Sequence, residues 1–358
     1  MKIDRPLKLE ENRVSRIYKG GALIDRFLGK NICTDGFFPE NWIGSDTAAL
    51  GDTGEGISQV IIDGENVALT TLITEHPEAL FGTAHRKRIG DRTGVLVKEL
   101  DSLIRLPIQS HPDRAFSKKY LSAEYGKTET WYILGGRTID GVPPHVYLGF
   151  TENADKASFR RAYDEQDVPA MLSMLNKVCV KEHDFFIIPG RVPHAIGSGV
   201  FCIEVQEPSD FVFQLDKKGP CWDLTPAQVH MDLGDDRMFE SFDLDGARGA
   251  SLLRSLASKS TGDADVDLLN GKWREFFGVR ILTVTASISY PVTSFAIAII
   301  MDGEGRFDGT GIRFGKGDAF IIPYAAKAVN IMNGGASPVS IFIASPPILC
   351  RQTSSDKE

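Results

Sequence analysis

A short sequence that occurs twice in this chain restricts how it can fold. Residues 184–189 read Asp-Phe-Phe-Ile-Ile-Pro, and residues 318–323, which lie 134 positions later, read Asp-Ala-Phe-Ile-Ile-Pro. Each copy has the form of a buried strand that follows an acidic turn and ends at a proline, which cannot donate a sheet hydrogen bond. A repeat of this kind predicts two related β modules rather than one continuous fold.

The two copies differ at one position that bears on function. His194 lies five residues after Pro189, whereas the equivalent position after Pro323 is Ala328. If His194 binds a ligand, only the first module is equipped for chemistry. We therefore expect the second module to be a structural partner.

The rest of the chain is typical of an all-β-dominated fold. Short runs rich in Val, Ile, Phe and Thr alternate with Gly, Pro, Asp and Asn, as in β-sandwiches, jelly rolls and barrels. The predicted organisation is a first β-barrel module over 1–245 with a small helical insertion near 155–178, a polar linker over 246–271, a second module over 272–350, and a tail over 351–358.

Composition and charge argue against several classes of function. The 358 residues are 42% hydrophobic and 25% charged, as in ordinary globular proteins. A net charge of −8 without a Lys/Arg block argues against a nucleic-acid partner. No apolar run approaches the roughly 18 residues of a membrane helix. The five cysteines lack CxxC spacing, so we expect reduced thiols and a cytoplasmic protein.

Four polar side chains from three segments are candidates to bind one metal ion. Gln109 and His111 stand two residues apart at the end of an apolar strand, so both can point to the same side. Glu129 opens the next strand, and His194 follows a loop stiffened by glycine and prolines. Imidazole and carboxylate ligands suit Zn²⁺, Fe²⁺ or Mn²⁺. Each residue alone is more often structural or solvated, so the prediction depends on their combination.

The ordered motifs around these residues resemble those of the type I mannose-6-phosphate isomerases (phosphomannose isomerases) of the cupin superfamily. The runs that carry the resemblance are Gln-Ser-His-Pro-Asp at 109–113, Gly-Lys-Thr-Glu-Thr-Trp-Tyr-Ile-Leu at 126–134 and Pro-Gly-Arg-Val-Pro-His-Ala-Ile-Gly at 189–197, with further matches at 38–45, 80–82, 96–98 and 204–210. The resemblance covers roughly residues 10–220 well and the C-terminal module only in broad pattern.

The resemblance implies a fold, a cofactor and a reaction. The fold is a double cupin, and the cofactor is one Zn²⁺ per chain, with other divalent metals possible, bound by Gln109, His111, Glu129 and His194. The reaction interconverts mannose 6-phosphate and fructose 6-phosphate by an enediol-type proton transfer between C1 and C2. The expected partner is thus a sugar phosphate, and a monomer or a homodimer both remain open.

Three further residues are candidates for the reaction and for substrate binding. Glu204, ten residues after His194, matches the family's candidate catalytic carboxylate, and a salt-bridged structural role is its alternative. Lys127 is a second catalytic candidate that could pair with a developing oxyanion or a phosphate. Lys98 stands in a mostly apolar strand, which is costly unless it faces a polar cavity or an acid, and we assign it to substrate binding.

Two positions depart from the family pattern. Members commonly carry an arginine ten residues after the position of Glu204, where this chain has Gln214, which cannot neutralise an enediolate or phosphate. Lys217 and Lys218 lie near it and are candidates to compensate, so we assign all three residues to substrate binding. Pro107 stands where many members have serine. These changes leave open an isomerase of a different sugar, a non-catalytic sugar-binding or sugar-sensing cupin and, more weakly, another reaction class such as an oxygenase.

Overall fold

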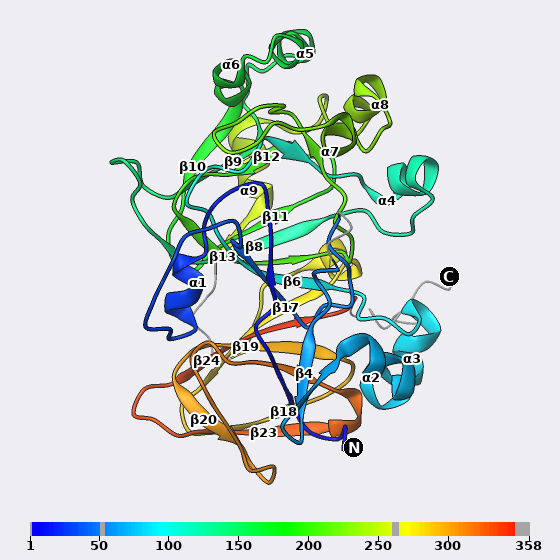
Figure 1. Ribbon diagram of the computed structural model, residues 1–358, viewed down its shortest axis with the longest axis vertical. Coiled ribbons are helices and arrows are strands. Elements are labelled where there is room, and N and C mark those ends of the chain that lie inside the picture. Colours follow the sequence, from blue (N-terminus) through cyan, green and yellow to red (C-terminus); the bar gives the residue numbers. More distant parts are fainter. Residues whose placement is uncertain (1, 51–53, 260–264, 348–358) are drawn as a thin grey trace, which may run out of the picture. The chain divides into compact units, whose positions relative to one another are not determined.

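The computed structural model of this protein describes residues 2–50, 54–259 and 265–347, and its elements fall into two compact units (Figure 1). Unit 1 combines Met1–Leu9, Val60–Val95 and Thr261–Glu358, and unit 2 combines Glu10–Gln59 and Leu96–Ser260. Strands make up more of the described chain than helices, which confirms the prediction of an all-β-dominated fold. No helix in these described ranges has the length and apolar character needed to cross a membrane.

Unit 2 contains two antiparallel sheets. The seven-stranded sheet has the order β15 (Ala257–Lys259), β11 (Asp184–Ile188), β8 (Glu129–Gly136), β13 (Val200–Gln206), β6 (Leu96–Asp101), β3 (Glu40–Ile43) and β2 (Arg13–Val14). The five-stranded sheet has the order β10 (Leu175–Cys179), β9 (His145–Phe150), β12 (His194–Ile196), β7 (Gln109–Ser110) and β14 (Phe213–Gln214). One hydrophobic cluster joins the sheets, with Trp131 and Ile133 from the first and Val146 and Leu148 from the second.

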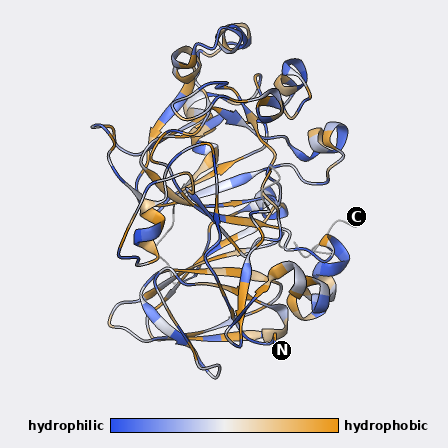
Figure 2. Cartoon of the chain, in the orientation of Figure 1, coloured by the Kyte–Doolittle hydropathy of each residue, from blue (hydrophilic) through white to orange (hydrophobic). Residues whose placement is uncertain are grey.

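The helices of unit 2 connect or cover these strands. They are α1 (Ala22–Phe27), α4 (Arg114–Phe116) continued by the π-helix Ser117–Leu121, α5 (Lys156–Asp164), α6 (Val168–Ser173), α7 (Pro226–His230), α8 (Asp235–Glu240) and α9 (Gly249–Leu256). Helices α5 and α6 form the predicted insertion, whose last predicted residues belong instead to β10. Along α5, hydrophobic and hydrophilic residues share the helix, in contrast to the long hydrophobic stretches of the strands (Figure 2).

Unit 1 also contains two antiparallel sheets. The eight-stranded sheet has the order β16 (Asp265–Asp267), β17 (Gly278–Val284), β24 (Val339–Ser345), β19 (Ala296–Asp302), β22 (Ala319–Ile322), β1 (Leu7–Leu9), β4 (Gln59–Ile62) and β5 (Glu65–Ala68). The four-stranded sheet has the order β18 (Ser287–Pro291), β23 (Ala328–Asn333), β20 (Glu304–Phe307) and β21 (Ile312–Gly315). The helices are α2 (Leu69–Glu75), α3 (Pro77–Ile89) and the 3₁₀ turns Gly271–Glu275 and Tyr324–Ala326.

The repeated sequence occupies equivalent places in the two units. Its first copy forms β11 and its second forms β22. His194 then begins β12, and Ala328 begins β23, so the two positions are equivalent in the order of the strands. That each pair of sheets is a cupin barrel remains a prediction.

The structure divides the chain differently from the predicted boundaries. Strand β1 pairs with β22 (Leu7 opposite Ile321), so the N-terminal strand is part of unit 1. The segment predicted as a linker over 246–271 contains α9 and β15, and Leu252 and Leu256 of α9 are buried in the core of unit 2. The exposed side of α9, with Ser251, Arg254 and Ser255, supplies part of its polar composition. The predicted tail over 351–358 lies outside the described residues.

Strand β6 carries a buried carboxyl group that titrates near neutral pH. Asn41 Nδ2 donates to Glu99 Oε2 at 2.9 Å, whereas Oε1 of this fully buried side chain has no hydrogen-bond partner among the described residues. Burial raises the pKa of Glu99 to about 7, although the Asn41 hydrogen bond and Arg13 act in the opposite direction. The folded protein therefore keeps a proton on Glu99 that an exposed glutamate would lose near pH 4.5.

This proton makes the stability of the protein depend on pH. Because the folded state binds more protons than the unfolded state between these pKa values, the free energy of unfolding should fall as pH rises from about 4.5 to about 7. We expect Glu99→Gln to match the wild type near pH 4.5 and to be more stable at pH 8 by on the order of 3 kcal/mol. Denaturant unfolding at both pH values tests this, and an unchanged pH dependence in the variant would contradict it.

Candidate metal centre

Three buried side chains from the two sheets of unit 2 meet at one point. One possible ligand atom from each of His111, Glu129 and His194 lies within 4.8 Å of the others. His111 follows β7 and His194 begins β12 in the five-stranded sheet, whereas Glu129 begins β8 in the seven-stranded sheet. Antiparallel pairing of β12 with β7 places Gln109 directly opposite His194. The predicted ligands thus come together although 85 residues separate the first from the last.

Backbone carbonyls fix the orientation of both imidazoles. His111 Nδ1 lies 2.9 Å from the carbonyl oxygen of Phe211, and His194 Nδ1 lies 2.8 Å from that of Val192. Since a carbonyl only accepts, each Nδ1 must carry the hydrogen, which leaves the lone pair of Nε2 facing the centre. A histidine ligand is typically held in this way by a hydrogen bond to its outer nitrogen.

The inner atoms of this cluster fit a cation. His111 Nε2 lies 3.2 Å from Glu129 Oε2, and His194 Nε2 lies 3.4 Å from Glu129 Oε1. Burial lowers the pKa of both imidazoles, that of His111 to about 3, so neither carries a second proton at neutral pH. Lone pairs thus face a carboxylate in a buried site, which is unfavourable without a positive charge between them. The nitrogen and oxygen donors suit a divalent ion such as Zn²⁺.

Lys127 and Gln109 complete the surroundings of this point. The ammonium of Lys127 lies 2.8 Å from both His111 Nε2 and Glu129 Oε2, so these hydrogen bonds and a metal ion compete for the same two atoms. The amide nitrogen of Gln109 lies 3.3 Å from His194 Nε2. Because rotation of an amide exchanges its nitrogen and oxygen, Gln109 can also supply an oxygen ligand. The four-residue ligand set remains a prediction that this arrangement fits.

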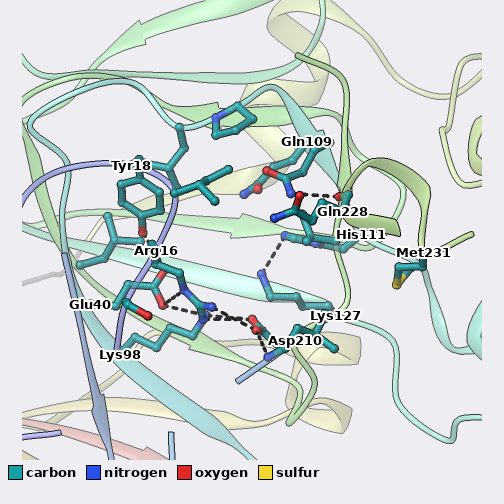
Figure 3. A pocket seen from close by; sticks show the side chains of 18 of the residues that line it. Arg16, Tyr18, Glu40, Lys98, Gln109, His111, Lys127, Asp210, Gln228 and Met231 are labelled. Carbon is teal, nitrogen blue, oxygen red and sulfur yellow. Dashed lines mark hydrogen bonds and ion pairs between the residues drawn. The ribbon is translucent and has the colours of Figure 1, made fainter. Parts of the chain in front are cut away.

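The cluster borders a cavity of about 690 Å³ within unit 2 (Figure 3). Gln109, His111 and Lys127 line it on one side, and Glu204 and Lys98 line it as well. A cavity of this volume is large enough for a small-molecule ligand.

Glu204 and Lys98 belong to a row of side chains that crosses four strands. The register places Trp131 opposite Glu204, Glu204 opposite Lys98, and Lys98 opposite Trp42. Lys98 Nζ lies 3.2 Å from Glu204 Oε1 and 4.8 Å from the centre of the Trp42 ring. The indole N–H of Trp131 is shared between Glu129 Oε1 (3.1 Å) and Glu204 Oε2 (3.2 Å). The carboxylate of Glu204 is therefore held between an indole and an ammonium.

Burial and neighbouring charges shift both titrating groups of this row. Burial raises the pKa of Glu204, as does the nearby Glu129 carboxylate, while Lys98 opposes the shift. Burial alone would lower the pKa of Lys98, but Glu40 and Glu204 outweigh it and the pKa is raised. Lys98 thus stays protonated, and the raised pKa of Glu204 makes this carboxylate a better acceptor for a proton than an exposed glutamate.

The cavity residues that were missing from the sequence-based prediction include four that interact with one another: Arg16, Tyr18, Glu40 and Asp210. Arg16 Nε donates to Glu40 Oε2 at 2.9 Å, and Tyr18 donates to Glu40 Oε1 at 2.6 Å. The other two nitrogens of the Arg16 guanidinium face Asp210. Glu40 and Asp210 lie inside two of the family-like runs, which was a signal for their position. Nothing in the sequence pattern singled out Arg16 or Tyr18.

The predicted substrate-binding residues do not all reach the cavity. Gln214 lines it, and its side-chain nitrogen donates to the carbonyl oxygen of Gln228 at 3.0 Å. Lys217 and Lys218 are not among the lining residues, and each is paired with an aspartate instead. The prediction that these two lysines compensate for Gln214 is therefore not supported, because their side chains point to surface carboxylates.

Removing one imidazole should abolish metal binding. We expect His111→Ala to lose the metal that copurifies with the wild type, because the variant lacks one of the two imidazole ligands. His183→Ala is the control, since His183 is a surface residue whose ring contacts Tyr132. Elemental analysis of the purified proteins measures the metal content. Equal metal content in the two variants would show that His111 is not a ligand and would contradict the candidate metal centre.

Comparisons with known proteins agree with these observations. No protein-family model matches the chain. The mannose-6-phosphate isomerase ManA of Bacillus subtilis (strain 168) is 28% identical over 257 residues, which are 70% of this chain and 74% of that protein. The mannose-6-phosphate isomerase of Streptococcus mutans serotype c is 30% identical over 218 residues, 59% of this chain and 60% of that protein.

Solved structures show a similar fold. A putative mannosephosphate isomerase from Archaeoglobus fulgidus superposes with a TM-score of 0.72 at 17% identity, over 97% of this chain and all (100%) of that one. A mannose 6-phosphate isomerase bound with zinc and yttrium gives a TM-score of 0.71 at 16% identity, over 96% of this chain and 100% of the other. The chain therefore resembles the mannose-6-phosphate isomerases in sequence and in fold, as its motifs predicted.

Proposed function

We propose that this protein is a metal-dependent aldose–ketose isomerase that interconverts mannose 6-phosphate and fructose 6-phosphate. The observation that carries the proposal is that the metal-type cluster and Glu204, whose pKa is raised, border the same cavity. The curated relatives named mannose-6-phosphate isomerase support the substrate, and the solved neighbour that binds zinc supports the metal. When bound by Gln109, His111, Glu129 and His194, a zinc ion would supply a Lewis acid for the sugar oxygens.

Glu204 is the proposed group that moves the proton. Its carboxylate takes the proton from C2 of the aldose while the Lys127 ammonium gives one to the carbonyl oxygen at C1, which gives an enediol. The resulting carboxylic acid then returns its proton to C1, and the C2 hydroxyl gives its proton back to the Lys127 amine, which gives the ketose. Trp131 and Lys98 hold one carboxylate oxygen each, so Glu204 need not reorient between the two transfers.

The two lysines are proposed to have different roles, Lys127 towards the substrate oxygens and Lys98 towards Glu204. Lys127 lies at the metal centre, where its ammonium can pair with negative charge that develops on the C1 or C2 oxygen. Lys98 is bound to Glu204 and keeps that carboxylate in place. Gln214 lines the same cavity and can hydrogen-bond a sugar hydroxyl.

We infer a cytoplasmic protein that binds one metal ion per chain, as monomer or homodimer. The four cysteines in the part of the chain that the structure describes are free thiols. Free thiols, two of them exposed, are typical of a reducing compartment.

The proposal predicts turnover that depends on the metal. Zinc-loaded protein should convert mannose 6-phosphate to fructose 6-phosphate, and a chelator should abolish the activity, which added Zn²⁺ should restore. A coupled assay for fructose 6-phosphate measures it. If the protein converts only a different aldose phosphate, the proposed substrate is wrong but the proposed reaction class is correct. If zinc-loaded protein converts no aldose at all, the proposal that it is an isomerase is wrong.

Glu204→Gln should separate proton transfer from binding. The amide keeps the size of the side chain but cannot accept the substrate proton, so kcat should fall by about 10²–10⁴-fold. Metal content should stay at the wild-type level, because Glu204 is not one of the proposed ligands. Glu182→Gln, at an exposed glutamate of the same unit, is the matched control and should keep full activity. A kcat within a few-fold of wild type in Glu204→Gln would exclude Glu204 as the base.

A further inference from the structure

The guanidinium of Arg16 is held firmly on one edge and loosely on the other. Its Nε lies 2.9 Å from Glu40 Oε2, whereas the two terminal nitrogens lie 3.3 Å and 3.2 Å from the Asp210 oxygens. Charge-assisted N–H···O bonds of this type are usually about 2.7–2.9 Å long. Glu40 therefore makes the shortest contact with the guanidinium, and the two terminal nitrogens make longer hydrogen bonds to Asp210.

Asp210 sits in surroundings that suit a larger anion. The terminal edge of Arg16 faces it, the backbone N–H of Leu50 donates to its Oδ2 at 2.9 Å, and Lys98 Nζ lies 3.9 Å from its Oδ1. A guanidinium fork, an ammonium and a backbone amide around one point are donors that proteins use to bind phosphate. Asp210 lies between β13 and β14, outside regular structure, so its side chain is not locked by a sheet.

Exposure distinguishes this pair from the rest of the charged network. The side chains of Arg16 and Asp210 are 15% and 11% exposed, whereas those of Lys98 and Glu40 are 3% and 5% exposed. The Arg16–Asp210 contact is thus the part of the network nearest to solvent. An anion entering the cavity can reach it, and the displaced carboxylate can be hydrated.

The position in the cavity also fits a phosphate. In Figure 3, Arg16 and His111 lie on opposite sides of Lys127. The phosphate of a hexose 6-phosphate is at the far end of the sugar from C1 and C2, so it must lie away from the metal centre. Of the three cations that line the cavity, Lys127 is bonded to the metal-centre residues and Lys98 to Glu204. The terminal edge of Arg16 is therefore the cation best placed for a phosphate.

We propose that Arg16 anchors the phosphate of the substrate and that Asp210 is an internal competitor, which the phosphate displaces from the guanidinium. This inference rests on the proposed function for the identity of the anion. In the exchange, both terminal N–H bonds pass from a carboxylate to a phosphate. The N–H of Leu50, released by Asp210, and the ammonium of Lys98, which keeps its contact with Glu204, can then bind its other oxygens. Glu40 keeps its bond to Nε throughout.

Binding of inorganic phosphate, measured by titration calorimetry on the metal-loaded protein, tests the exchange without depending on turnover. Arg16→Gln should weaken binding by about tenfold or more, because a charged two-pronged contact is lost. The phosphate affinity of Arg16→Lys should lie between those of Arg16→Gln and the wild type, since lysine keeps the positive charge but lacks the two-pronged guanidinium. Asp210→Asn should bind phosphate more tightly than the wild type, because the competing charge is removed.

Arg280 and Asp265 provide the matched control. They form a similar two-bond pair (3.0 Å and 2.8 Å) in unit 1, and neither is among the residues that line the cavity. Arg280→Gln and Asp265→Asn should leave phosphate binding unchanged. Equal phosphate affinity in Arg16→Gln and Arg280→Gln would overturn the role of Arg16, and weaker phosphate binding by Asp210→Asn would overturn the competition.

Steady-state kinetics separates this inference from the proposed function. If the protein is the proposed isomerase, Arg16→Gln should raise KM for mannose 6-phosphate and change kcat much less, because the phosphate is remote from the reacting carbons. If the protein binds phosphate through Arg16 but has no isomerase activity, the proposed function is wrong and the anion site at Arg16 is correct. If Arg16→Gln is an active isomerase with the KM of the wild type, the proposed function is correct and the role of Arg16 in phosphate binding is wrong.

Discussion

The candidate metal centre of unit 2 depends on one electrostatic constraint, the burial of a carboxylate between two neutral imidazoles. The Glu129 oxygens face the Nε2 atoms of His111 and His194 at 3.2 and 3.4 Å, while the outer nitrogens of both rings are committed to backbone carbonyls. Such an arrangement needs a positive charge at its centre. Lys127 supplies one through two 2.8 Å contacts, and a divalent metal ion would supply more charge to the same atoms. The cluster is thus arranged around a cation.

The connection between β13 and β14 joins this centre to the other end of the cavity. The carbonyl oxygen of Phe211 orients His111, and the adjacent Asp210 faces Arg16. Two further bonds tie the same stretch to the backbone that carries Lys127: Ser209 donates to the carbonyl of Gly126, and the N–H of Thr128 donates to Glu207. A single short segment therefore supports the metal centre and occupies the proposed phosphate position. Its anchored ends limit the movement that an exchange at Asp210 can transmit to His111.

The sequence predicted the site better than the division into units. Gln109, His111, Glu129 and His194 could be grouped because strand ends and a proline-containing loop set their local geometry, and because their order resembles a known family. The pairing of β1 with β22 joins residues more than 300 positions apart, and three residues of a short strand carry too little pattern to reveal it. Arg16 was missed for a related reason, since its partners Glu40 and Asp210 are 24 and 194 residues away. Lys217 and Lys218 were close to the site in sequence only.

The two units differ in the side chains that lie between their sheets. In unit 1, Phe307, Phe314 and Phe320 fill the space between the sheets, with ring centres 4.8 to 6.5 Å apart. In unit 2, the row formed by Trp131, Glu204, Lys98 and Trp42 lies on the cavity side of the sheet, and its polar groups remain paired. A buried lysine or glutamate is tolerated only with such partners. Replacing His194 by an alanine, as at Ala328, would therefore not by itself give unit 2 the aromatic packing of unit 1, because the row of paired charges would remain.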